Sequence, residues 1–461
     1  MDVGKVSGTV SFGEEHFGAC DFGGRRLTRR VVITANRMLS HPGGTLPDKL
    51  NDNADLMGFY RLANNHKVTH GKLLAAHSAR TRSRIAGASG VVLILHDTTE
   101  LDFSGRDSVK DLGPIGDGGG RGFLCHNSLA YDYQRREALG LASQILHKRR
   151  EVPDRETRKA SRNHPERESR LWKAGWKALG PVSEGTMRVN IADRGADTQE
   201  FIEAMELGKD HYVVRSKSNR RMVLDGGRSG GKLHDFARAL PTLCIRQVQV
   251  PSNHGQSARE AVVRVAAGPV VLAAPQVARG EHSQSPLAGR QGRPREIDPP
   301  VGASPLEWIL LTNVPVANPE PAHERISWYA CRPVIEEYHK APKTGCGIEL
   351  PQFTTGKALQ AGIAMLSVVA TQLLQLRDAS RLPNADVRPA GDLVPQEYAA
   401  VLSAWRFGEI HTTMRVHDFC WALAKLGGHL NRKASYANNL IHLRCLRADG
   451  VIPFAVKVVR E

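Results

Sequence analysis

Five residues with chemically useful side chains recur at helical spacing: Tyr329, Arg332, Glu336, Lys340 and Lys343. The spacings of three, four, four and three place all five within an arc of about 80° on an unbroken helix. A carboxylate among cations suits a site where the carboxylate binds a metal ion and the cations hold phosphates. The alternative is a solvated helix face stabilised by the ion pairs Arg332–Glu336 and Glu336–Lys340.

Two aspartates follow apolar runs that are typical of buried strands. The run from Val91 leads to Asp97, and the run from Met187 leads to Asp193. Ligands of covered sheets gather at the carboxyl ends of strands, where we expect both aspartates to lie. Taken alone, each aspartate could be a turn residue or a helix N-cap. Together with Glu336 they give three hard carboxylates, which suit two Mg²⁺ ions at a phosphodiester.

The order of predicted elements around these aspartates indicates an α/β fold. Residues 122–132 and 138–147 have the pattern of two strands joined by a turn, and residues 168–179 that of a helix. Three consecutive strands, a helix and a further strand would form a mixed sheet covered by helices. This is the order of a ribonuclease H-like core.

The chain resembles the cut-and-paste DDE transposases of bacterial insertion sequences, in the insertion-sequence-four family with the YREK signature. The signature Y-x2-R-x3-E-x6-K reads Tyr329, Arg332, Glu336 and Lys343 here. The family's first acid precedes Thr-Thr, as Asp97 does, and its second opens an Asp-Arg-(Glu/Gly)-Ala-Asp motif, as at residues 193–197. Other blocks similar to the family lie at residues 58–62, 212–217, 305–312 and 359–377. The resemblance spans about residues 17 to 426.

The residues themselves argue for metal-dependent phosphoryl transfer on DNA, and the resemblance adds a route through a DNA hairpin and joining to target DNA. The catalytic residues and metal ligands would be Asp97, Asp193 and Glu336, binding two Mg²⁺ ions for which Mn²⁺ could substitute. The residues expected to contact DNA are Arg26, Arg30, Arg215, Trp308, Tyr329, Arg332, Lys340 and Lys343. Trp308 would stack on a flipped base, although a core tryptophan in a strand is the equal alternative.

The chain divides into five predicted segments. These are a helical DNA-binding domain (1–84), the first part of the ribonuclease H-like core (85–205), a β-rich insertion (206–304), the second part of the core with the YREK helix (305–380) and a helical C-terminal domain (381–461). Within the insertion, residues 274–303 are Pro/Gly/Arg-rich and are expected to form a mobile loop. By resemblance, the C-terminal domain would support a homodimer.

Composition favours a polyanionic partner. Lys and Arg number 63 against 47 Asp and Glu, a net charge of +16. Double-stranded DNA fits this charge, and a membrane surface is the competing polyanion. No signal peptide is recognised, and the most apolar stretch, residues 361–376, is too short to span a membrane comfortably. The seven cysteines lack a CxxC pair, which indicates reduced thiols rather than a zinc site. We therefore expect a cytoplasmic, nucleoid-associated protein.

Three departures from the family bear on activity. Pro333 stands where relatives often have a tryptophan wedge, and a proline is compatible with the motif helix only within its first turn. Pro342 is expected to end or bend that helix, and Cys331 replaces a residue more usual in relatives. Two alternatives to an active transposase stay open. One is a catalytically impaired, transposase-derived DNA-binding regulator, and the other is a nuclease without strand transfer.

Overall fold

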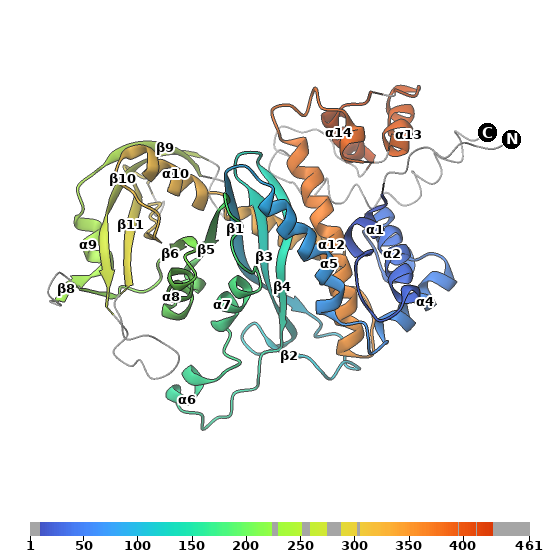
Figure 1. Ribbon diagram of the computed structural model, residues 1–461, viewed down its shortest axis with the longest axis horizontal. Helices are drawn as coiled ribbons and strands as arrows, with labels where there is room; N and C mark the ends of the chain where they lie inside the picture. The colour runs from blue at the N-terminus through green and yellow to red at the C-terminus, as the bar shows by residue number, and fades with distance from the viewer. Residues whose placement is uncertain are drawn as a thin grey trace.

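A mixed sheet runs through the computed structural model, which describes residues 10–223, 229–250, 259–273, 287–301, 305–394, 396–411 and 413–426. Within these residues the sheet has twelve strands, in the order β2-β3-β1-β5-β6-β12-β11-β10-β7-β8, with β4 beside β3 and β9 beside β10. Helices cover it, and further helices lie beyond α12 (Figure 1). The protein is thus of mixed α/β class, as the sequence predicts.

The N-terminal region is helical throughout its described part. Its elements are α1 (Phe12–Phe17), α2 (Arg25–Ser40), α3 (Leu46–Lys49), α4 (Asn53–Ala63) and α5 (His70–Ala86). Side chains cap four of these helices: Ser11 caps α1, Thr45 and Asp48 form a capping box at α3, Asp52 caps α4 and Thr69 caps α5. The buried side chains of α2 and α4 share one core with those of α5 and α12.

The first half of the sheet contains the strands predicted around the two aspartates. Its elements are β1 (Val91–Asp102), β2 (Gly113–Ile115), β3 (Gly120–Asp132), β4 (Glu137–His147), α6 (Arg158–Asn163), α7 (Arg170–Lys177), β5 (Met187–Ala192), the 3₁₀ turn η1 (Arg194–Ala196), α8 (Gln199–Leu207) and β6 (His211–Arg215). β3 and β4 are antiparallel, whereas β1, β5 and β6 are mutually parallel. On β1, Leu93 and Leu95 pack towards α12, while Val92 and Ile94 pack with Leu179. Both faces of β1 are therefore buried, which explains its unbroken apolar run.

One expectation for β1 is wrong, because this strand does not end at Asp97. It continues to Asp102, which pairs with Gly122 of β3. Only the parallel ladder with β5 stops earlier, at the pair His96–Ala192. Pairing with β3 therefore continues along β1 after the pairing with β5 has stopped.

The second half of the sheet lies between residues 221 and 312. Its elements are β7 (Arg221–Val223), β8 (Ser229–Lys232), α9 (Leu233–Ala239), β9 (Cys244–Val250), β10 (Arg259–Leu272), β11 (Leu287–Glu296) and β12 (Leu310–Thr312). The prediction of a loop over 274–303 is wrong for 287–296, which forms β11, and residues 274–286 and 302–304 lie outside the described part. β11 pairs with β10 from Leu272–Leu287 to Val263–Glu296, so a tertiary partner outweighs its low apolar content.

The motif region is two helices rather than the single helix predicted. α10 (Pro319–Tyr329) ends at Tyr329, and α11 (Pro333–Lys340) begins at Pro333 with Arg332 as its N-cap. Pro333 is therefore at the first helical position, where its missing N–H has no helical partner to lose. After Lys340 the chain continues as the π-helical turn η3 (Ala341–Gly345), which contains Pro342. The expected end of the regular helix near Pro342 is confirmed.

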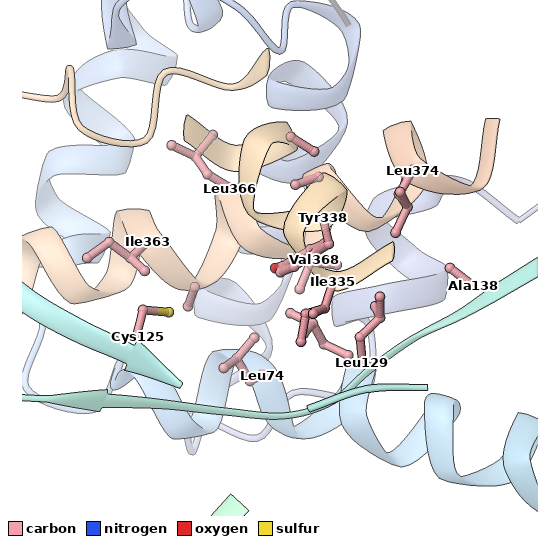
Figure 2. Packing of buried hydrophobic residues seen from close by; sticks show 14 of the residues in the cluster. Leu74, Cys125, Leu129, Ala138, Ile335, Tyr338, Ile363, Leu366, Val368 and Leu374 are labelled. Atoms are coloured by element: carbon pink, nitrogen blue, oxygen red, sulfur yellow. The ribbon is translucent and has the colours of Figure 1, made fainter. Parts of the chain in front are cut away.

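A long apolar helix, α12 (Gly356–Ser380), forms the centre of the main core. In Figure 2, Val368 of this helix lies beside Tyr338 of α11, and Ile363, Leu366 and Leu129 belong to the same cluster. In the described residues it alone is long and apolar enough to cross a membrane, and 78% of its apolar window is buried. Such burial identifies α12 as a core helix. The last described elements are η4 (Ala390–Asp392), α13 (Gln396–Phe407) and α14 (Val416–Leu426).

Candidate active site

Asp97 and Asp193 are the first residues beyond the parallel pairing of β1 and β5. The last pair of that ladder is His96–Ala192, so the two aspartates follow it on neighbouring strands. Asp193 is also the N-cap of η1, where its Oδ1 accepts a hydrogen bond of 2.8 Å from the backbone N–H of Gly195. Asp193 therefore has the N-cap role expected for a lone aspartate and also directly follows β5, the strand that pairs with the strand of Asp97.

A buried chain of polar side chains fixes the strands immediately before the two aspartates. Asn190 Nδ2 donates to the carbonyl oxygen of His211 at 2.9 Å, so its Oδ1 accepts from His96 Nε2, also at 2.9 Å. His96 Nδ1 then accepts from Ser128 Oγ at 3.0 Å. Burial lowers the pKa of His96 to about 4, which keeps it neutral. These hydrogen bonds link β3, β1, β5 and β6. His96 is therefore a structural residue rather than a metal ligand.

Arg332 brings the three predicted acids together. From the start of α11, its Nη2 lies 2.8 Å from Asp97 Oδ2 and 3.6 Å from Asp193 Oδ2. Its Nη1 bonds Glu336 one turn along the helix. Burial opposes the charge of Arg332, but the carboxylates outweigh this and raise its pKa. Residues far apart in the sequence therefore meet around a single guanidinium.

The chemistry of these carboxylates suits Mg²⁺, which prefers oxygen ligands and retains several waters. Their side chains are 15%, 35% and 49% exposed for Asp97, Asp193 and Glu336, so water can reach the cluster. Among the described residues no group of three His, Cys, Asp or Glu side chains is already arranged to hold a metal ion. The guanidinium of Arg332 lies where the carboxylates converge, and it would have to leave before they could share a cation.

The pH dependence of stability should identify Asp97 as a buried acid. Burial, only partly opposed by the charge of Arg332, raises the pKa of Asp97 from 3.8 to about 6. The folded state then binds this proton more tightly than the unfolded chain. The stabilisation is full below about pH 4 and is lost as the pH rises through about 6, a change on the order of 3 kcal/mol. Urea unfolding from pH 4 to 7 should show this slope in the native protein and a weaker slope in Asp97→Asn. Equal slopes would contradict the assignment.

Tyr329, Trp308 and Arg215 form one group at the end of α10. The rings of Trp308 and Tyr329 meet edge-on, with their centroids 5.0 Å apart. Arg215 donates to the carbonyl oxygen of Glu307 at 3.1 Å and also bonds the Tyr329 side chain. Trp308 is only partly buried against the core and lies before β12 rather than in it. One face of Trp308 is thus held by protein while the side chain keeps exposed surface.

The two lysines of the motif pair with glutamates outside the carboxylate cluster. Lys340 Nζ lies 2.7 Å from Glu337, so the expected pair with Glu336 is replaced by a pair with the adjacent glutamate. Lys343 Nζ lies 3.8 Å from Glu349. Both side chains are partly exposed, 49% for Lys340 and 33% for Lys343, and can reach an external phosphate.

The two N-terminal arginines differ in their surroundings. Arg26 is exposed on α2. Arg30, one turn later, lies 2.7 Å from Asp55 of α4, which also contacts Arg37 at 3.3 Å. Arg30 therefore helps to join α2 to α4 and is less free than Arg26 to bind phosphate.

The salt dependence of DNA binding should separate these roles. Arg26→Ala is expected to weaken binding to duplex DNA and to reduce the log–log salt slope by about 0.9, because one phosphate contact is lost. Fluorescence anisotropy at several salt concentrations measures both quantities. Lys177→Ala on α7 serves as a control for loss of one exposed positive charge. An Arg26→Ala protein with the native affinity and slope would remove Arg26 from the interface.

One residue of the cluster was missed by pattern analysis. His339 is buried on α11, and its Nδ1 lies 4.0 Å from Asp97 Oδ2. It follows Glu336 by three residues, so the helical spacing that singled out its neighbours also includes His339. Asn127 of β3, whose Nδ2 lies 3.1 Å from His339 Nε2, has no comparable sequence signal.

Residues 10–68 match the family model described as transposase DNA-binding. The matched segment contains α1 to α4 and therefore both Arg26 and Arg30. The match supports a transposase that binds DNA. It ends before α5 and does not include the carboxylate cluster.

Proposed function

We propose that the protein is a DNA transposase of the insertion-sequence-four type. It would bind the terminal inverted repeats of a transposon, cleave them by metal-dependent phosphoryl transfer and join them to target DNA. The observation that carries this proposal is the convergence of Asp97, Asp193 and Glu336 on Arg332. The transposase DNA-binding match at residues 10–68 supports the choice of DNA as substrate.

Strand order supports a ribonuclease H-like core. β4-β3-β1-β5-β6 lie side by side, with β3 antiparallel to β1 and with β5 and β6 parallel to β1. The three antiparallel strands come first in the sequence, followed by helices and the two parallel strands, which is the order expected for that core. The catalytic carboxylates would then lie where parallel strands end, as ligands of open α/β sheets do.

The residues of the site would have separate roles at the scissile phosphate. Asp97, Asp193 and Glu336 would hold two Mg²⁺ ions, which when bound supply activation of a water or 3′-hydroxyl and stabilisation of the leaving oxygen. Arg332, once released from the carboxylates, would bind a phosphate oxygen with its planar donor fork. Lys340 and Lys343 would neutralise neighbouring phosphates at the exposed edge of the site.

The group around Trp308 would hold the DNA end during hairpin formation. Its partly exposed ring could stack on an extruded base, a contact worth about 1–3 kcal/mol. Tyr329 contacts that ring edge-on and, with Arg215, would hydrogen-bond a phosphate. A homodimer would bring two ends together, by resemblance to the family, on the nucleoid in the cytoplasm.

Pro333→Trp should speed the hairpin steps more than first-strand nicking. Pro333 lacks the flat aromatic ring of a tryptophan wedge, and unstacking a base costs on the order of 2–3 kcal/mol. A tryptophan at this first position of α11 would offset part of that cost. Gel analysis of nicked, hairpin and resolved ends over time measures each step. Equal hairpin rates in the native and Pro333→Trp proteins would show that a wedge at this position is unnecessary.

Pro333, with Cys331 and Pro342, also favours the impaired regulator as a second candidate. Incubation with Mg²⁺ and duplex DNA carrying the inverted repeats that flank the gene distinguishes the candidates. We expect nicks with free 3′-hydroxyls at the repeat boundary, and none in a duplex with a scrambled repeat. Equal cleavage of both duplexes would indicate a nuclease without end specificity. Tight binding of the repeat without cleavage would indicate a regulator.

A further inference from the structure

A buried amide controls the side chain that faces Asp97 from α11. His339 Nε2 lies 3.1 Å from Asn127 Nδ2, and its Nδ1 lies 4.0 Å from Asp97 Oδ2. The imidazole thus lies between a side chain of β3 and the most buried carboxylate of the cluster. Which ring nitrogen carries the proton decides what His339 presents to Asp97.

The orientation of Asn127 is fixed by its backbone partner. Asn127 Nδ2 lies 3.2 Å from the carbonyl oxygen of Cys125, which can only accept a hydrogen bond. The same NH₂ group therefore donates to His339 Nε2, so the neutral ring carries its proton on Nδ1. Burial, and then the charges of Lys343 and Arg332, lower the pKa of His339 to about 3. His339 consequently presents a neutral N–H donor to Asp97.

The hydrogen-bond chain continues through β4 to the N-terminal helices. Asn127 Oδ1 accepts from Gln144 Nε2 at 2.8 Å, and that nitrogen also lies 3.0 Å from Ser367 Oγ of α12. Gln144 Oε1 in turn accepts from His70 Nε2 at 3.0 Å. Every donor thus points the same way, from the first residue of α5 towards Asp97. Aligned hydrogen bonds in a buried chain polarise and hold one another.

We propose that His339 is a positioning residue for Asp97, oriented by the chain from His70 through Gln144 and Asn127. The inference rests on the proposed function, in which Asp97 binds a metal ion. Carboxylates that ligate metals are themselves held by hydrogen bonds from outer groups. Asp97 Oδ2 is at present bonded to Arg332, and His339 Nδ1 at 4.0 Å is about 1 Å beyond hydrogen-bond range. Release of Arg332 leaves that oxygen free to take the bond from His339.

Two substitutions of similar size separate positioning from simple packing. Asparagine in place of His339 puts its NH₂ where Nδ1 now faces Asp97. Glutamine puts its amide where Nε2 faces Asn127 and leaves no donor towards Asp97. A purely structural His339 would be replaced better by glutamine, because the bond to Asn127 is kept. A positioning His339 would be replaced better by asparagine.

The experiment is a Mn²⁺ titration, followed by electron paramagnetic resonance, of the full chain bound to DNA carrying the flanking repeat. We expect His339→Gln to weaken Mn²⁺ binding about 10–100-fold, the usual cost of losing an outer partner, and His339→Asn to retain most of the affinity. Asn127→Asp, which replaces the donor by an acceptor, should also weaken Mn²⁺ binding. Asn127 is the cross-strand partner of Asp97 in the β1–β3 ladder, but its side chain bonds His339. His417→Asn on the exposed face of α14 is the control, and thermal unfolding checks the fold of each variant.

Separate outcomes would contradict the two claims. Equal Mn²⁺ affinities for His339→Asn and His339→Gln, or a better glutamine variant, would overturn the positioning role while leaving the metal site intact. A native complex that binds no Mn²⁺ would overturn the proposed function and this inference with it. If the variants unfold, the nitrogen-15 spectrum of histidine in the native protein tests the proposal instead. A proton on Nε2 of His339 would contradict the hydrogen bond from Asn127 and so the positioning role.

Discussion

Asp97→Asn is expected to abolish strand cleavage while binding to the transposon end is retained. Asparagine keeps the shape of the side chain but removes its charge, so a cation loses the most buried of three anionic ligands. The loss should exceed the roughly 100-fold that removal of an outer-shell partner can cost. Cleavage is measured on labelled repeat DNA with Mg²⁺, and binding by gel shift in Ca²⁺. Asp193→Asn and Glu336→Gln should behave alike, since all three carboxylates share Arg332.

Asp102→Asn provides the matched control for this experiment. Asp102 ends the same strand, but it is exposed and its Oδ1 accepts from the backbone and side chain of Ser104. It should cleave at close to the native rate. Near-native cleavage by Asp97→Asn would mean that Asp97 is not a metal ligand, and equal losses in both variants would point to damage of β1 itself.

Arg332→Gln is expected to strengthen Mn²⁺ binding by the DNA-free protein and to abolish cleavage. In the native protein the guanidinium neutralises the carboxylates that a cation would otherwise use. Two unit charges about 4 Å apart interact by roughly 4 kcal/mol at an effective dielectric constant of 20, and solvent exposure of Glu336 reduces this. We therefore expect a gain in affinity of at least about tenfold. Cleavage should fail because the phosphate loses its planar donor.

A charge-matched control separates this contact from a general effect of net charge. Lys340→Gln removes one positive charge from the same helix, but Lys340 pairs with Glu337 rather than with the cluster. Titration of both variants with Mn²⁺ in the absence of DNA gives the comparison. An equal gain in both variants, or no gain in Arg332→Gln, would contradict a competition between Arg332 and the metal ion.

The secondary structure around the aspartates was predictable because local patterns and tertiary partners agree there. The strands β3 and β4, the helix α7 and the strand β5 lie within a few residues of their predicted positions. Asp97 was predicted at a strand end but lies within β1, since periodicity cannot show that β3 continues to pair after β5 stops. β11 was missed for a similar reason, because its pairing with β10 is a long-range contact.

The composition of the candidate site was more predictable than its geometry. The residue types and spacing indicated a carboxylate and cations near one another, but the single helix face is broken between Tyr329 and Arg332. Because the helix is broken there, Arg332 lies at the start of α11, and its guanidinium contacts Asp97 of β1. His339 shares the helical spacing, yet its role depends on Asn127, a residue 212 positions away in the sequence. Such a partner becomes visible only when β3 and α11 are packed together.

Anomalous diffraction from crystals of the protein bound to repeat DNA and Mn²⁺ would show whether the three carboxylates hold the metal ion. We expect Mn²⁺ bonded to Asp97, Asp193 and Glu336, with the guanidinium of Arg332 withdrawn to a DNA phosphate. This expectation would be contradicted by a complex that cleaves in solution yet shows no Mn²⁺ at these carboxylates, with Arg332 still bonded to Asp97.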